Sequence, residues 1–222
     1  MREIVLDTET TGLDPAGGHR IVEIGCVELV DQMPTRRDYH EYINPEMEMP
    51  EGALEVHGLT TEFLSGKPRF AEIVESFLSF IGSDTLVVHN APFDIGFLNA
   101  ELERLSHAPL PLECAVDTVL LARRKFPGAP ANLDALCKRF GIDNSHRTRH
   151  GALLDAELLA EVYLELLGVR QNALRLGPSS RAERLAVAAG PVRAPREHGP
   201  SVEEAAAHAA FIATLKHPIW KD

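Results

Sequence analysis

The stretch Ile4–Gly12, IVLDTETTG, carries the pattern that decides the fold. Three apolar residues end in Asp7-Thr8-Glu9, so a short buried strand brings two carboxylates to the point where the chain turns. Residues i and i+2 of a strand point to the same side, so Asp7 and Glu9 lie together although their charges repel. Either both acids cap the turn before Gly12, or they bind a hard divalent cation that removes the repulsion. The stretch alone leaves both roles open.

The segments around this strand predict an α/β fold with a mixed sheet. Residues 19–30 alternate apolar and polar side chains over part of their length, as a half-buried strand does, and residues 37–45 form a third strand that Asn44-Pro45 stops. Short connections between these three strands predict an antiparallel meander. Strands and helices then alternate, which is typical of an α/β fold. The later elements are strands at 85–90 and at the start of 114–126, and helices at 70–82, 92–105, in the rest of 114–126, at 132–141 and at 151–168.

The composition of the chain changes after Gly168. Residues 169–201 are rich in Ala, Pro, Gly, Arg and Ser, which predicts a flexible linker. Residues 202–222 return to helical spacing and contain the single Trp of the chain. We therefore expect one domain over residues 1–168, a linker, and a terminal segment with little core of its own to join.

Composition and charge exclude several classes of protein. Hydrophobic residues make up 45% and charged residues 25% of the chain, a mix typical of soluble globular proteins. The N-terminus has no signal segment, and no apolar run reaches the roughly 18 residues of a membrane span, so a cytoplasmic protein without a membrane is expected. Cys26, Cys114 and Cys137 predict reduced core thiols. The net charge of −11 argues against a broad grip on duplex nucleic acid, although bound divalent cations allow a carboxylate cluster to bind a polyanion locally.

Two further carboxylates occur in settings like that of Asp7 and Glu9. Asp94 follows an apolar strand and lies in the first turn of a helix, where favouring the helix dipole is the alternative role. Asp155 lies one turn inside the clearest helix, near its apolar side and after His150, where an ion pair is the alternative. Four carboxylates are about what two divalent cations need when water and phosphate supply the other ligands. Such a pair of cations stabilises the attacking and leaving oxygens of an in-line phosphoryl displacement.

Three motifs resemble those of a known enzyme family. DTETTG (7–12), HNAPFD (89–94) and HGALLD (150–155) look like the exonuclease motifs of the DEDD superfamily of 3′–5′ exonucleases, and His150 marks the histidine subtype. The likeness extends over about residues 1–168 and implies a ribonuclease-H-like fold with a five-stranded mixed sheet flanked by helices. It also implies that two cations, Mg²⁺ or Mn²⁺, are held by Asp7, Glu9, Asp94 and Asp155, and that His150 is the general base.

Positions near His150 and near the substrate follow from the same likeness. Five residues separate His150 from Asp155, so the two do not share a helix face and His150 is expected to precede the helix. Its neighbours Arg147 and Arg149 could attract phosphate. The resemblance further implies contacts to the 3′-terminal nucleotide of single-stranded DNA, for which packing or turn-capping roles are the alternatives. These contacts fall on Thr8, Thr10, Val56, His57, Asn90 and Phe93.

The tail of the chain predicts protein partners. QNALRL (171–176) resembles the Q-x-x-L-x-[LF] peptide by which polymerase subunits bind the sliding clamp, with Gln171, Leu174 and Leu176 as its anchors. The frayed end of the preceding helix is the alternative. Residues 202–222 resemble the segment by which proofreading subunits of bacterial replicases bind the alpha subunit of the polymerase.

These features together predict a 3′–5′ exodeoxyribonuclease that proofreads for a replicative polymerase and releases nucleoside 5′-monophosphates. A related RNA-trimming exonuclease and a non-catalytic link between clamp and polymerase are the alternatives. The clamp peptide and the terminal segment favour the replicase over RNA trimming, and the intact set of four acids plus His150 argues against the non-catalytic link.

Overall fold

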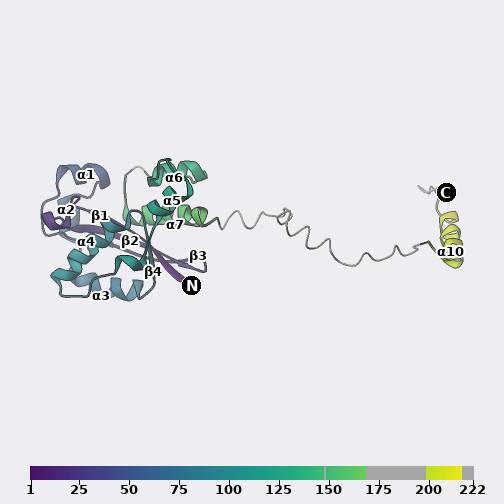
Figure 1. Ribbon diagram of the computed structural model, residues 1–222, viewed down its shortest axis with the longest axis horizontal. Helices are drawn as coiled ribbons and strands as arrows, with labels where there is room; N and C mark the ends of the chain where they lie inside the picture. Colours follow the sequence, from purple (N-terminus) through teal and green to yellow (C-terminus); the bar gives the residue numbers. More distant parts are fainter. Residues whose placement is uncertain (148, 169–198, 217–222) are drawn as a thin grey trace. The chain divides into compact units, whose positions relative to one another are not determined.

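A computed structural model describes residues 1–147, 149–168 and 199–216 of the chain, which divides into two compact units, Met1–Arg175 and Leu176–Asp222. The first unit is built on one five-stranded sheet with the strand order β3-β2-β1-β4-β5 (Figure 1). β1, β2 and β3 pair antiparallel, whereas β4 and β5 run parallel to β1, so the predicted meander and mixed sheet are confirmed. The strands are β1 Arg2–Thr10, β2 Ile21–Val30, β3 Met33–Tyr42, β4 Thr85–Val88 and β5 Ala115–Asp117.

Helices cover both faces of the sheet. Figure 1 shows α3 and α4 on one face, α5, α6 and α7 on the other, and α1 and α2 at the end towards which β1 runs. Their bounds are α1 Glu51–His57, α2 Thr61–Ser65, α3 Phe70–Ile81, α4 Ala91–Arg104, α5 Thr118–Lys125, α6 Leu133–Phe140 and α7 Ala152–Leu167, with 3-10 turns at Pro15–Gly17 and Leu112–Cys114.

The alternation of β1 divides the core into two clusters. Ile4 and Leu6 pack among the buried residues of α3 and α4, whereas Val5 packs among those of α6 and α7. A strand buried on both faces reads as an apolar run, which is why β1 begins with three aliphatic residues. Since side chains of a strand alternate, the odd-numbered residues that follow Val5 face α7 and the even-numbered residues face α4.

Several expectations about single elements need correction. β3 begins at Met33, four residues earlier than predicted, and ends at Tyr42. β2 is buried on both faces rather than half-buried, because its acidic residues are buried with partners: Glu23 pairs with His40, and Glu28 pairs with Arg2. The short helices α1 and α2 were not predicted. All three cysteines are free, as predicted, but Cys114 is exposed and lies outside the core.

In the second unit the structure describes one helix, α10 Val202–Ala213. Ser201 caps it by accepting from the backbone N–H of Glu204. Its apolar side chains are exposed, with Val202 at 87% and Phe211 at 60%. The predicted clamp peptide, with Gln171, Leu174 and Leu176, and the end of the terminal segment from residue 217 lie outside the described residues. Among the helices that the structure describes, none is long and apolar enough to cross a membrane.

Candidate active site

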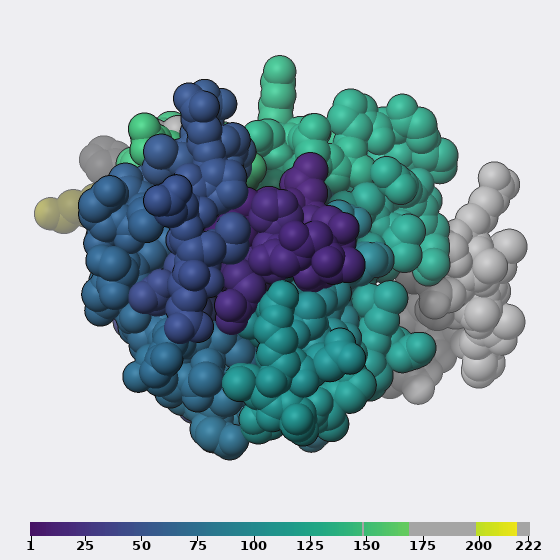
Figure 2. All heavy atoms as spheres, turned by 90° about the vertical axis from the view of Figure 1, so that its left-hand side faces the viewer, coloured from purple at the N-terminus to yellow at the C-terminus, as the bar shows by residue number. Residues whose placement is uncertain are grey.

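A cavity of about 890 Å³ opens at the carboxyl ends of β1 and β4. The chain that follows β1, purple in Figure 2, lies between the blue residues of α1 and α2 and the green residues that follow α5. All four predicted carboxylates and the predicted base line the cavity, as do five of the six predicted nucleotide contacts. These residues are Asp7, Glu9, Asp94, Asp155, His150, Thr8, Thr10, Val56, His57 and Phe93.

The pleat of β1 assigns its polar residues to two sides. Asp7 and Glu9 follow Val5 on the face that α7 covers. Thr8 faces α4, where its backbone N–H and its hydroxyl both donate to Oδ1 of Asp94, at 3.0 and 2.7 Å. Thr8 therefore anchors Asp94, which is 3% exposed in the first turn of α4. Thr8, the single residue that separates Asp7 from Glu9, thus also fixes the third carboxylate.

A glycine brings the fourth carboxylate into place. Gly25 is the cross-strand partner of Asp7, and a Cβ there would lie 2.3 Å from the backbone of Ala152 and Leu153 in the first turn of α7. The absence of a side chain lets this turn lie directly on the sheet, so that Asp155 is buried beside Glu9. Sequence reasoning missed this role, although a glycine inside a strand pattern is a signal of close backbone approach.

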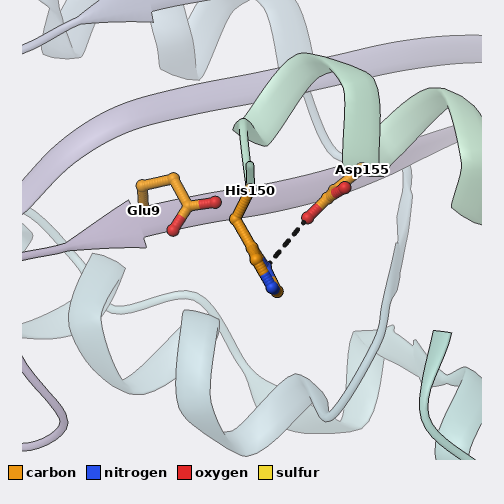
Figure 3. A group of neighbouring side chains, drawn as sticks. All are labelled: Glu9, His150 and Asp155. Atoms are coloured by element: carbon orange, nitrogen blue, oxygen red, sulfur yellow. Dashed lines mark ion pairs between the residues drawn. The ribbon is translucent and has the colours of Figure 1, made fainter. Parts of the chain in front are cut away.

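Glu9, His150 and Asp155 form the tightest part of the cluster. One possible ligand atom from each lies within 4.8 Å of the others, and Figure 3 shows the three side chains converging from β1, from the residues before α7 and from its first turn. Nδ1 of His150 lies 3.4 Å from Oδ2 of Asp155. His150 precedes α7, as predicted, and its backbone N–H donates to the carbonyl of Val56 at 3.3 Å.

Asp7, Glu9 and Asp94 hold protons unusually tightly. Burial, followed by the charges of Asp155 and Glu23, raises the pKa of Glu9 to about 8. Burial also raises the pKa of Asp94 to about 7. For Asp7, burial and then the charge of Asp94 raise the pKa well above its usual range. Such a cluster binds either protons or cations, and carboxylate oxygens are the ligands that Mg²⁺ and Mn²⁺ prefer. The residues therefore fit a divalent-metal site.

Arg147 is the cation that the structure places in this cluster. Its guanidinium donates from NH2 to Oδ2 of Asp155 at 2.7 Å and from Nε to Oδ1, and from NH1 to Asp134 at 3.0 Å. The same NH2 lies 2.8 Å from Nδ1 of His150. Since a guanidinium cannot accept, Nδ1 is the acceptor, and the proton of a neutral His150 ring sits on Nε2. Arg147 had been expected only as a phosphate attractor, and this pairing was missed.

His57 presents an unpaired polar atom at the cavity. It is 6% exposed, and its Nδ1 accepts from the backbone N–H of Leu59 at 3.0 Å. Among the residues that the structure describes, its Nε2 forms no hydrogen bond of regular geometry, although the Thr10 backbone lies close enough to favour a proton on the ring. Burial lowers the pKa of His57, with the Thr10 backbone acting in the opposite direction, so the ring favours the neutral form with its proton on Nε2. A buried donor without a partner is costly, which is typical of a site that a ligand completes.

The other predicted contacts differ in their surroundings. Val56 is 45% exposed, and Phe93 is half-buried with its ring 5.0 Å from that of Phe97. The hydroxyl of Thr10 donates to the carbonyl of Gly12 at 2.6 Å, so this residue also caps the turn. Asn90 does not line the cavity with the carboxylates. It lines a second cavity beside it.

Fold and carboxylate site together define a metal-dependent 3′–5′ exonuclease. A family model described as an exonuclease of the RNase T type matches residues 4–163, and the chain belongs to this family. Over 97% of its own length and 97% of the relative's, it is 51% identical to the DNA polymerase III subunit epsilon of Rickettsia felis. The subunit epsilon of Haemophilus influenzae is 49% identical, over 77% of this chain and 69% of the relative.

Solved structures agree with this assignment. Exonuclease X in complex with 5′-overhanging duplex DNA shares 25% identity and a TM-score of 0.60, covering 75% of this chain and 92% of that one. The nuclease domain of 3′hExo, a DEDDh family member bound to rAMP, shares the fold, with 18% identity, a TM-score of 0.64 and the same shares covered. The predicted ribonuclease-H-like exonuclease fold is confirmed.

Proposed function

We propose that this chain is the proofreading subunit of a bacterial DNA polymerase III, a 3′–5′ exodeoxyribonuclease that removes mispaired terminal nucleotides and releases nucleoside 5′-monophosphates. The observation that carries the proposal is the meeting of four carboxylates and His150 in one cavity, in a chain that is similar over its whole length to subunit epsilon. The same similarity supports a cytoplasmic location.

Asp7, Glu9, Asp94 and Asp155 are the residues that would hold two divalent cations, Mg²⁺ or Mn²⁺. When bound, such cations stabilise the charge on the attacking and leaving oxygens of the phosphodiester. The protein's own part is to hold the carboxylates in place through Thr8, Gly25 and the first turn of α7.

His150 is the general base in this proposal. Its side chain is 48% exposed and lies at the cavity, so a water molecule can reach it. An imidazole titrates close to neutrality, which suits it to take a proton from the water that attacks the phosphodiester. In the arrangement described, Arg147 engages Nδ1, so the ring must give up this contact before Nδ1 can accept a proton.

The residues on the nucleotide side of the cavity account for a preference for mismatched ends that does not depend on recognising a particular base. Val56 and Phe93 offer apolar surface to a base, and His57 offers an unpaired donor. Thr8 and Thr10 are the remaining proposed contacts in this cavity, whereas Asn90 lines the cavity beside it. An enzyme that accepts any unpaired 3′ end favours mismatches, because a frayed terminus costs less to deliver as a single strand. The polymerase would bind the duplex DNA, because this acidic chain lacks the basic surface that such binding needs.

Hydrolysis of a 3′-mismatched DNA primer tests the activity. We expect purified protein to shorten the primer in Mg²⁺ or Mn²⁺, and Asp7→Ala and His150→Ala to reduce the rate at least about a hundredfold. An RNA primer of the same sequence separates the RNA-trimming alternative, since preferential cleavage of RNA would support it. If the DNA primer and the RNA primer both stay intact in both metals, only the non-catalytic link remains.

The two proposed partners have separate tests. The alpha subunit of DNA polymerase III is proposed to bind residues 202–222, where the exposed apolar residues of α10 offer a docking face. Deleting residues 200–222 should abolish alpha binding and preserve nuclease activity, and unchanged binding would remove this assignment. The sliding clamp is proposed to bind residues 171–176. Gln171→Ala with Leu174→Ala should weaken clamp retention in a pull-down, and equal retention would contradict it.

A further inference from the structure

A second cavity of about 630 Å³ adjoins the one that holds the carboxylates. Its walls come from the residues after β4, from α5 and from the segment before α6, and it shares His89 and Asn132 with the first cavity. The first turn of α4 separates the two: Phe93 and Asp94 line the first cavity, whereas Asn90 and Pro92 line the second. The two cavities therefore adjoin each other beside Asp94, a proposed metal ligand.

The order in which residues line the two cavities fixes the direction in which a bound strand would run. At one end, Val56 and His57 of α1 form the proposed place for the terminal nucleoside. The carboxylates, where the bond to be cleaved must lie, come next. His89 and Asn132 then lead into the second cavity. A strand whose last phosphodiester lies on the carboxylates thus has its preceding nucleotides on the side of the second cavity.

The second cavity has the chemistry that single-stranded DNA needs. Leu120 is 57% exposed, and Pro130 is exposed near it, which gives apolar surface for a base or sugar. Arg123 is exposed and, within the described part of the chain, forms no ion pair, so its charge is available to a phosphate. Sequence-tolerant binding of single strands combines such cations with flat apolar surface.

Asn90 adds a strained backbone at the wall shared by the two cavities. Its φ of 72° is left-handed, a conformation that asparagine adopts more readily than most residues other than glycine, and its exposed side chain does not cap α4. Backbone strain of this kind is concentrated at functional sites, because the surrounding structure has to maintain it. The conformation turns the chain from β4 into α4 and leaves the amide at the second cavity instead of the first.

We propose that the second cavity binds the nucleotides that precede the scissile phosphodiester of a single DNA strand, with Arg123 at a phosphate, Leu120 and Pro130 against a base or sugar, and Asn90 at polar groups of the same nucleotide. The inference rests on the proposed function and specifies where its substrate continues. The first cavity then recognises the 3′ end, and the second holds the strand that leads to it.

Two substrates of different length test the assignment. The p-nitrophenyl ester of thymidine 5′-monophosphate directs only a small aromatic leaving group, without a phosphate, towards the second cavity, whereas a thymidine decanucleotide places its preceding nucleotides and their phosphates there. For Arg123→Gln and for Leu120→Ala we expect the KM of the decanucleotide to rise about three- to tenfold. The KM and kcat of the ester should stay within about twofold of wild type. Arg124→Gln is the matched control, since Arg124 is exposed on the same helix and does not line the cavity.

Salt dependence gives a second readout. Loss of one phosphate contact should reduce the slope of log KM against log salt by about 0.7 for Arg123→Gln, and leave it unchanged for Leu120→Ala. An unchanged decanucleotide KM in both variants, or an equal effect of Arg124→Gln, would overturn the inference while ester hydrolysis keeps the proposed function. If wild type cleaves neither substrate, the proposed function fails and the inference fails with it.

Discussion

Arg147 and Asp155 form a two-pronged ion pair in which the guanidinium donates to both oxygens of the carboxylate. Asp155 is also a proposed metal ligand, so a bound cation and Arg147 compete for the same oxygens. In the metal-free chain Arg147 neutralises the charge of Asp155 and holds Nδ1 of His150 through the same NH2 group. Metal binding and release of His150 are thereby expected to be linked.

Removing the competitor should strengthen metal binding. In Arg147→Gln we expect the Kd for Mn²⁺, measured by calorimetry, to fall about three- to tenfold, because the ion pair no longer has to be broken. The kcat should not fall, since His150 has to give up its contact with Arg147 before Nδ1 can accept a proton. Arg149→Gln is the matched control, because Arg149 is exposed and packs over Gly58. Weaker Mn²⁺ binding in Arg147→Gln would show that Arg147 supports the ligands instead of competing with them.

The contact between Gly25 and α7 predicts a change in both stability and metal affinity. In Gly25→Ala the new methyl group meets backbone at 2.3 Å, so the first turn of α7 must move away from Asp7. We expect the free energy of unfolding to fall by about 1–3 kcal/mol and Mn²⁺ binding to weaken. Denaturant titration and calorimetry measure the two effects.

A control substitution at another glycine should change the free energy of unfolding in the opposite direction. Gly96 lies inside α4 with open space around it, so Gly96→Ala should raise the free energy of unfolding by about 0.5–1 kcal/mol. Unchanged Mn²⁺ affinity in Gly25→Ala would mean that the position of Asp155 does not depend on this close approach.

The raised pKa values of Glu9 and Asp94 predict how pH acts on the metal-free chain. Both carboxyls titrate near about 4 when unfolded, but at about 8 and about 7 in the fold, so the folded chain binds more protons over the interval between. Linkage then requires stability to fall as pH rises through this interval, and to level off above it. Between about pH 5 and 8, the Tm of EDTA-treated protein should fall as pH rises.

A bound divalent cation should take the place of the protons that stabilise the metal-free cluster. Millimolar Mg²⁺ is expected to raise the Tm more at about pH 8.5 than at about pH 6.5, because cation binding requires ionised ligands. Glu9→Gln removes one titrating group and should flatten the Tm profile of the EDTA-treated protein. A Tm that rises with pH in the absence of metal would contradict the pKa assignments of this cluster.

The parts of the site that sequence could predict are those that depend on local pattern. The i, i+2 spacing places Asp7 and Glu9 on one face, and the position of Asp94 in a helix follows from the preceding strand and Pro92. Pairings between distant segments were not predictable in this way. Thr8 and Asp94 are 86 positions apart, and Gly25 meets the first turn of α7 only once that helix is folded onto β2.

The distinction between local pattern and pairing of distant segments also explains why some elements of the fold were predicted wrongly. β3 is an edge strand with mostly exposed side chains, so no apolar alternation marks its start at Met33. α1 is short and half exposed, and begins after Pro50 without a side-chain cap. Helices with a wide buried stripe, such as α3 and α7, were predicted to within a residue or two of their ends.

The unpaired Nε2 of His57 predicts an effect on substrate affinity that is separate from catalysis. Asparagine places an amide near the position of Nδ1 and can still accept from the N–H of Leu59, whereas glutamine reaches the position of Nε2. We therefore expect His57→Asn to raise the KM for the nucleotide ester about tenfold with kcat little changed, and His57→Gln to raise it less. Thermal unfolding of His57→Asn should stay close to wild type, because Nε2 makes no bond in the free protein that the substitution could break. Equal KM values for the two variants would show that the cavity uses the shape of this side chain and not its donor, and a fall in kcat alone would move His57 from binding the nucleotide to the chemical step.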